Sequence, residues 1–181
     1  MRITIAFSAI LLAAGCSAVV PAPAPSQSAA AAPTPAPAPA SAPAPKQPEG
    51  NWIDWPLSAG DWVYRQDDRG SIALFGPPNA EAIFMIRCDQ GRNQLFVSRE
   101  GTVANSGAQM TLRASSGLQS FSARNSGGTL NYAATMIPVS DIIMDRIAFS
   151  RGRFAVETTG LQSIAIPIWP EFTRVVEDCR S

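Results

Sequence analysis

The chain has 181 residues with 14 basic and 14 acidic side chains, no histidine, three cysteines and 16 prolines. This balanced charge argues against a nucleic-acid binder, which carries a surplus of basic groups on its folded part. The lack of histidine removes the commonest metal ligand and the commonest general base, so we expect no metal and no other cofactor. The composition excludes classes of function without selecting one.

The first sixteen residues have the pattern of an export signal. Arg2 precedes an uncharged stretch, residues 3–14, which has the length of a secretory apolar region and is shorter than the roughly 20 residues that span a bilayer. Residues 12–16 read LAAGC, which resembles the lipobox of bacterial lipoproteins. That resemblance implies cleavage after residue 15 and acylation of Cys16. The alternative is an ordinary signal cut at a small-residue site.

The resemblance also implies a location. Ser17 follows the cysteine, and lipoproteins without aspartate at that position usually go on to the outer membrane, where they face the periplasm. Two or more acyl chains give stable anchoring, so the expected partner at this end is the membrane itself.

Residues 16–48 form the expected lipidated cysteine and a tether. From residue 17 on, this stretch contains 10 prolines and 12 alanines. Proline breaks helices, and the segment has almost no large apolar side chain to bury, so we expect a disordered spacer. In the polyproline II conformation it would reach about 100 Å when fully extended. The alternative is a ligand for an aromatic groove on another protein.

Residues 49–181 form the expected globular domain, which is mildly acidic with 12 arginines against 14 carboxylates. Short alternating apolar runs separated by turn residues predict strands. The runs lie at residues 62–65, 72–75, 83–86, 95–97, 110–113, 119–123, 130–136, 154–156 and 164–166. We expect one mainly β (α+β) domain, an antiparallel sandwich or a partial barrel, with two short helices of which the last is C-terminal.

The two helices have recognisable starts. Ser140 is the expected cap of the first, in which Ile143 and Ile147 share a face. Pro170 begins the second, because proline is favoured in the first helical turn. Its apolar positions recur at helical spacing and form one stripe; they are Phe172, Val175, Val176 and Cys179.

Cys88 and Cys179 remain once Cys16 is assigned to the lipid. Both lie on predicted buried faces, and an exported protein folds in an oxidising compartment, so we predict a disulfide between them. Closing a loop of about 92 residues would contribute roughly 4–5 kcal/mol by loop entropy. The alternative is a reactive thiol, which would lack a histidine or nearby lysine to lower its pKa.

The end of the chain bears a likeness to one family. Phe154-x-Val156, Gly160-Leu161 and Ile164-x-Ile166, followed by a helix and Cys179, resemble the closing elements of invasion-associated-locus-B-type periplasmic proteins. These are small secreted β-sandwich proteins, so the resemblance implies a fold and carries no catalytic residue. The chain as a whole resembles uncharacterised tethered bacterial lipoproteins.

Two sets of side chains are candidate ligand sites. Trp52, Trp55 and Trp62 cluster where the tether meets the domain, and flat rings of this kind stack on sugars or peptides. The alternative is a flap that protects a sheet edge. Arg151 and Arg153 share a strand face and could grip a carboxylate or phosphate, unless they pair with Glu157 on the same face.

Catalytic candidates are restricted to carboxylates. Glu81, Glu100 and Glu157 lie on or near strands and could act as a glycosidase pair, although a solvated strand face is the simpler interpretation. Asp67 and Asp68 together make only a weak calcium site.

The hypothesis that fits these observations is a non-catalytic, lipid-anchored periplasmic module that binds or scaffolds an envelope protein or glycan. The alternatives are a carboxylate-dependent envelope hydrolase acting on peptidoglycan or another glycan, and a structural envelope protein without a specific ligand.

Overall fold

The computed structural model describes residues 46–181. The expected signal (residues 1–15), Cys16 and nearly all of the tether therefore lie outside the described residues. The described elements are η1 (Trp52–Asp54), β1 (Asp61–Asp67), β2 (Gly70–Gly76), β3 (Phe84–Asp89), β4 (Gln94–Glu100), β5 (Gln109–Ala114), β6 (Gly117–Ser122), β7 (Arg124–Asn125), β8 (Tyr132–Pro138), α1 (Ile142–Ala148), β9 (Arg153–Thr158), β10 (Ile164–Pro167) and α2 (Pro170–Asp178).

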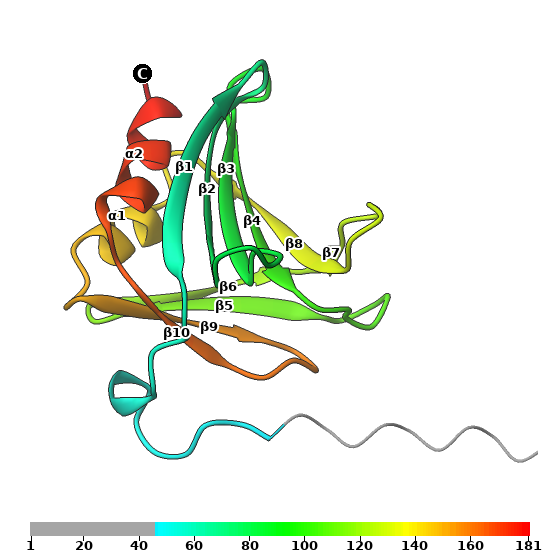
Figure 1. Cartoon of the computed structure of the whole chain (residues 1–181), viewed down its shortest axis with the longest axis vertical. Helices are drawn as coiled ribbons and strands as arrows, with labels where there is room; N and C mark the ends of the chain where they lie inside the picture. Colours follow the sequence, from blue (N-terminus) through cyan, green and yellow to red (C-terminus); the bar gives the residue numbers. More distant parts are fainter. Residues whose placement is uncertain (1–45) are drawn as a thin grey trace, which may run out of the picture. The chain divides into compact units, whose positions relative to one another are not determined.

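The strands form two antiparallel sheets. One has six strands in the order β1-β2-β3-β4-β8-β7, and the other has four in the order β10-β9-β5-β6. Figure 1 shows the two sets of strands crossing steeply, as in an orthogonal sandwich. The prediction of a mainly β domain with two short helices is confirmed. Of the two architectures expected, the described strands build the sandwich.

Turn residues close two hairpins of the six-stranded sheet. β1 and β2 form a hairpin that closes at Asp67 and Gly70, and β3 and β4 form another that closes at Asp89 and Gln94. Gly70 has φ +133°, and a Cβ there would lie 2.7 Å from the carbonyl oxygen of Cys88. Only glycine allows this close approach of the first hairpin to β3.

The core fills the space between the sheets and the helices. Aromatic rings form its centre: Trp62 packs on Phe75 with ring centroids 5.3 Å apart, and Phe154 lies 5.4 Å from both Phe84 and Phe172. Each such side chain, when fully buried, contributes about 1.5–3 kcal/mol to stability. The inner faces of the two sheets are therefore committed to the core.

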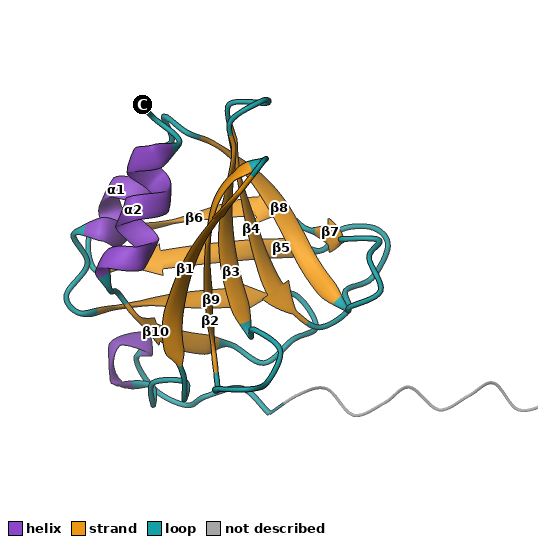
Figure 2. Cartoon of the chain, turned by 45° about the horizontal axis from the view of Figure 1, so that its top comes forward, coloured by secondary structure: helices purple, strands orange, loops and turns teal. Residues whose placement is uncertain are grey.

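Both helices lie side by side against one flank of the sandwich (Figure 2). α2 packs on β1, β2 and β3 and begins at Pro170, as expected. α1 packs on β5 and β6, but its cap is Asp141 and not Ser140 as predicted. Asp141 is the residue with extended backbone immediately before the helix, and its Oδ1 accepts a hydrogen bond from the Ile143 amide at 2.9 Å.

A disulfide joins α2 to β3. Cys88 and Cys179 are bonded with a Cα–Cα distance of 5.3 Å, and both are buried. The predicted pairing is confirmed, and it holds the C-terminal helix against the centre of the six-stranded sheet.

Candidate functional site

A groove of about 630 Å³ crosses the outer face of the six-stranded sheet. Its volume lies within the range of about 300–1,000 Å³ that is usual for small-molecule sites. The side chains that define it here are Arg69, Met85, Arg87, Phe96, Phe121, Arg124, Ala134 and Met136. The groove reaches the corner where the chain leaves the four-stranded sheet at the end of β6 and enters the six-stranded sheet as β7. We call this feature the groove.

Strand register explains why the floor of the groove is apolar. Successive side chains point to opposite faces, so the neighbours of core residues on β3, β4 and β8 face outward. Two rows of cross-strand neighbours result: Arg87–Phe96–Met136 and Met85–Ser98–Ala134–Arg124. Met136 is 57% exposed on a sheet face that no other described element covers with a second layer. An apolar patch left on a sheet face in this way is typical of an interaction site.

The groove has a positive rim. Its lining includes three guanidinium groups and no carboxylate. Arg87 is held by Asp67, whose carboxylate lies 2.7 Å away, and Arg69 is 3.5 Å from the carboxylate of Asp89. Within residues 46–181, Arg124 has no carboxylate at ion-pair distance, and its side chain is exposed. Arg124 is therefore the arginine that is free to meet an anion.

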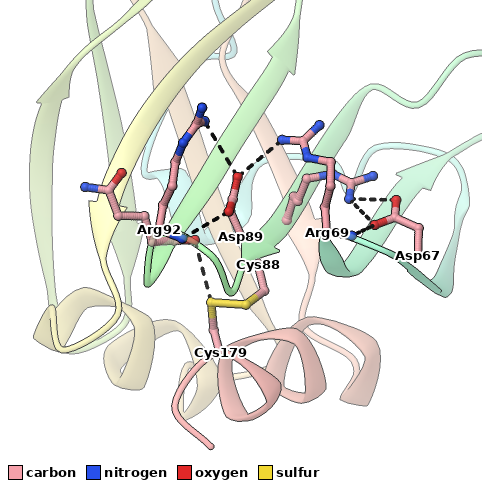
Figure 3. A network of polar contacts seen from close by, with 8 residues as sticks. Asp67, Arg69, Cys88, Asp89, Arg92 and Cys179 are labelled. Carbon is pink, nitrogen blue, oxygen red and sulfur yellow. Dashed lines mark hydrogen bonds and ion pairs between the residues drawn. A yellow bond between two sulfur atoms is a disulfide. The ribbon is translucent and has the colours of Figure 1, made fainter.

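A charged network fixes the opposite end of the groove (Figure 3). The Asp89 side chain accepts a hydrogen bond from the Arg92 amide at 3.2 Å and lies between the guanidinium groups of Arg69 and Arg92. The hydrogen bond from Arg87 holds the pKa of the Asp67 carboxyl below its ordinary value of 3.8. Figure 3 also shows this network next to the disulfide, so the bond fixes the strand end that carries Arg87 and Asp89.

The three candidate tryptophans do not form an open platform. Trp62 is 5% exposed in the core, and its indole N–H donates to the Pro167 carbonyl at 2.8 Å. Trp55 is 9% exposed and packs on Ala155 and Ala165 of the four-stranded sheet, with Trp52 packed against the same cluster. Of the two arrangements that the sequence left open for Trp52 and Trp55, the packing fits the flap and not the ligand platform.

Residues 46–58, which we call the strap, lie against β9 and β10 on the outer face of the four-stranded sheet. Ser58 donates its amide to the Ala165 carbonyl at 2.8 Å, beside an isolated parallel bridge between Leu57 and Ala165. Gln47 makes two hydrogen bonds of 2.8 Å, one to the Leu161 carbonyl and one from the Ser163 amide. The strap therefore lies along the edge strand β10, which is the flap arrangement that the sequence left open.

The two candidate arginines also have other roles. The Arg153 guanidinium donates to the Trp55 carbonyl at 2.7 Å and so holds the strap. Arg151 lies in the bend before β9 and is exposed. The sequence also allowed both arginines to pair with Glu157. Neither does so, because Arg113 on the neighbouring strand lies 2.7 Å from that carboxylate. The two arginines are thus not brought together as an anion grip.

The candidate carboxylates divide between two places. Glu157 is paired on the four-stranded sheet, whereas Glu81 and Glu100 line a separate hollow of about 340 Å³ together with Tyr132. Burial raises the pKa of the Tyr132 hydroxyl, and the charges of the two glutamates add to this shift. Among the described residues, no group of three or more carboxylate, cysteine or histidine side chains could hold a metal ion, and Asp67 of the weak calcium candidate is bound by Arg87.

The groove was not predicted from the sequence. One signal for it is present in the sequence: residues 83–86 are apolar on both strand faces, which is the pattern of a central strand. β3 does lie inside the six-stranded sheet, but the outward Met85 lines the groove instead of a second buried layer. Arg124 stands in a turn-rich segment, and only the pairing of β7 with β8 places it at the groove.

Comparison of the chain with known protein families, with characterised proteins and with solved structures finds no match. The resemblances drawn from the sequence therefore stay predictions. No helix in the described part of the chain is long and apolar enough to cross a membrane.

Proposed function

We propose that this protein is a lipid-anchored, non-catalytic binding module of the bacterial cell envelope, facing the periplasm from the outer membrane. The groove carries the binding part of this proposal, because it is an open apolar surface with a cationic rim. The lipobox-like residues 12–16 support the anchor, and the Pro/Ala-rich stretch supports a spacer between membrane and domain.

The anchor is tested by removing the acceptor of the lipid. In cells, Cys16→Ala is expected to release the protein from membranes into the soluble envelope fraction. Continued sedimentation of Cys16→Ala with membranes would contradict the proposed lipid anchor. The substitution lies outside the folded domain, so the thermal unfolding of the domain serves as a control and is expected to be unchanged.

The binding surface is tested by crosslinking from two positions in intact cells. A photoreactive phenylalanine analogue replaces Met136 in the groove and, as a matched control, Phe149, which is 85% exposed at the end of α1. A discrete adduct from position 136 that is absent from position 149 supports the proposal. Equal labelling at both positions, or none at position 136, overturns the groove as the binding surface.

A second candidate function rests on Glu81 and Glu100. Their shared hollow is a specific arrangement of two carboxylates, which a glycan hydrolase would need. Glu81→Gln and Glu100→Gln, made singly, are expected to leave any turnover of peptidoglycan unchanged if the binding proposal holds. A nearly complete loss of turnover at both positions would favour the hydrolase instead.

A further inference from the structure

We propose that the groove binds a fatty-acid anion, with the carboxylate at Arg124 and the acyl chain over Met85, Phe96 and Met136. This inference rests on the proposed binding function and gives the chemical class of the ligand.

The length of the groove floor and the flexibility of its side chains fit an acyl chain. Arg124 on β7 and Arg87 on β3 are separated by three strand spacings, which is about 14 Å. The side chains between them are mostly apolar, and two are methionines, whose flexible thioethers adapt to irregular aliphatic ligands. Ser98 is the polar exception in the middle of the floor.

The charge around the groove fits one anionic head group at one end. Arg87 lies 2.7 Å from Asp67, and Arg69 lies 3.5 Å from Asp89, a carboxylate that it shares with Arg92, so each of the two has an acidic partner in its own network. Arg124 has no such partner among the described residues, and the exposed hydroxyls of Ser122 and Ser126 line the groove on either side of it in sequence. A guanidinium with hydroxyl donors nearby is well suited to a carboxylate.

Methionine methyl groups provide a direct readout of this binding mode. The full chain carrying Cys16→Ala, so that it has no lipid of its own, is labelled with ¹³C at its methionine methyls. Met85 and Met136 report on the groove, whereas Met110 and Met144 are fully buried in the core and serve as internal references. The probes are dodecanoate, dodecyltrimethylammonium and a neutral dodecyl glycoside, each kept below its critical micelle concentration.

Dodecanoate is expected to shift the Met85 and Met136 signals in a saturable way and to leave those of Met110 and Met144 in place. The cationic probe is expected to bind at least about tenfold more weakly, since it cannot accept the charge-assisted hydrogen bond that Arg124 donates to a carboxylate. Arg124→Gln is expected to weaken dodecanoate binding about tenfold while leaving the neutral probe unaffected. The matched control, Arg151→Gln, removes the same charge from an exposed bend outside the groove and is expected to change nothing.

Three results would overturn the fatty-acid assignment: no saturable shift of Met85 and Met136, equal affinity for the anionic and cationic probes, or equal loss in Arg124→Gln and Arg151→Gln. Shifts produced only by the neutral glycoside would overturn it as well. The crosslinking experiment is independent of these probes. Adducts at position 136 without dodecanoate binding would keep the binding module and reject the ligand class.

Discussion

The outer faces of the two sheets differ in how their apolar side chains are covered. On the four-stranded sheet, Trp55 covers the small side chains of Ala155 and Ala165, and the strap adds hydrogen bonds along the edge strand. On the six-stranded sheet, Met85, Phe96 and Met136 face outward and form the floor of the groove. Figure 1 shows the strap on the side of the four-stranded sheet that faces away from the six-stranded sheet.

The difference shows which sheet face the chain covers with its own side chains and which face it leaves exposed. Small alanines on the four-stranded sheet leave room for a tryptophan from a neighbouring segment, whereas larger apolar side chains on the six-stranded sheet have no such cover among residues 46–181. An apolar face that a protein leaves open is usually covered by something else. The comparison predicts that substitutions on the covered face change stability and that substitutions on the open face change binding.

The largest effect is expected at the disulfide, because the loop that it closes contains strands of both sheets. Replacing Cys88 and Cys179 together by alanine removes the constraint on the loop between them and should lower the free energy of unfolding by about 4–5 kcal/mol. Chemical denaturation measures this value. Both outer faces should be weakened alike; a loss confined to either sheet, seen by hydrogen exchange, would show that the disulfide supports one face only.

Uncovering the four-stranded sheet should have the next largest effect. Trp55→Ala removes a ring that is 9% exposed and is expected to cost about 3 kcal/mol, with faster amide exchange at Ser58. Trp169 is 40% exposed, so Trp169→Ala is the matched control, expected to cost less than half as much. Equal losses in the two variants would contradict the covering role of Trp55.

A smaller effect is expected at the start of the strap. Gln47→Ala removes two hydrogen bonds at an exposed site, so we expect a loss of about 1 kcal/mol in thermal or chemical unfolding. The matched control is Gln66→Ala on β1, because no hydrogen bond of the Gln66 side chain is found in the described part of the chain. If the two glutamine variants lose the same stability, the two Gln47 bonds do not hold the strap.

The smallest effect is expected at the end of the groove, and it depends on pH. The pKa of Asp67 is lowered in the folded state by the hydrogen bond from Arg87, so its stabilisation is present in full above the ordinary value of 3.8 and is lost as the pH falls through the lower folded value. Asp67→Asn should therefore be less stable than the parent protein at neutral pH, and the difference should shrink in acid. A stability difference that does not change between pH 7 and pH 2 would contradict the ion pair.

Much of the fold could be predicted from the sequence because its signals are local. The turn residues at 67–70 and 89–92 lie where the two hairpins close, and the helical spacing of Phe172, Val175 and Val176 predicted α2 together with its buried face. The Cys88–Cys179 pairing followed from the number of cysteines and the faces on which they lie. Each of these predictions depends only on a few neighbouring residues or, for the disulfide, on the one way in which two cysteines can pair.

The groove could not be predicted in the same way, because it depends on pairing between distant strands. Arg124 and Met85 are brought together by the order β3-β4-β8-β7, which no local pattern specifies. The burial of the tryptophans could not be predicted for a related reason. Trp55 and Trp62 are close in sequence, yet one packs on an outer sheet face and the other lies in the core between the sheets.

The position of the disulfide in the sequence also bears on the order in which its two thiols can meet. Cys179 follows Cys88 by 91 residues, so in a chain that is exported from its N-terminus Cys88 arrives well before its partner. During that interval, Cys16 is the other thiol of the emerging chain that Cys88 could meet. Acylation of Cys16 would remove this competitor as a thioether. Attachment of the lipid would thus also protect the correct pairing of a bond that closes far from the lipid in sequence.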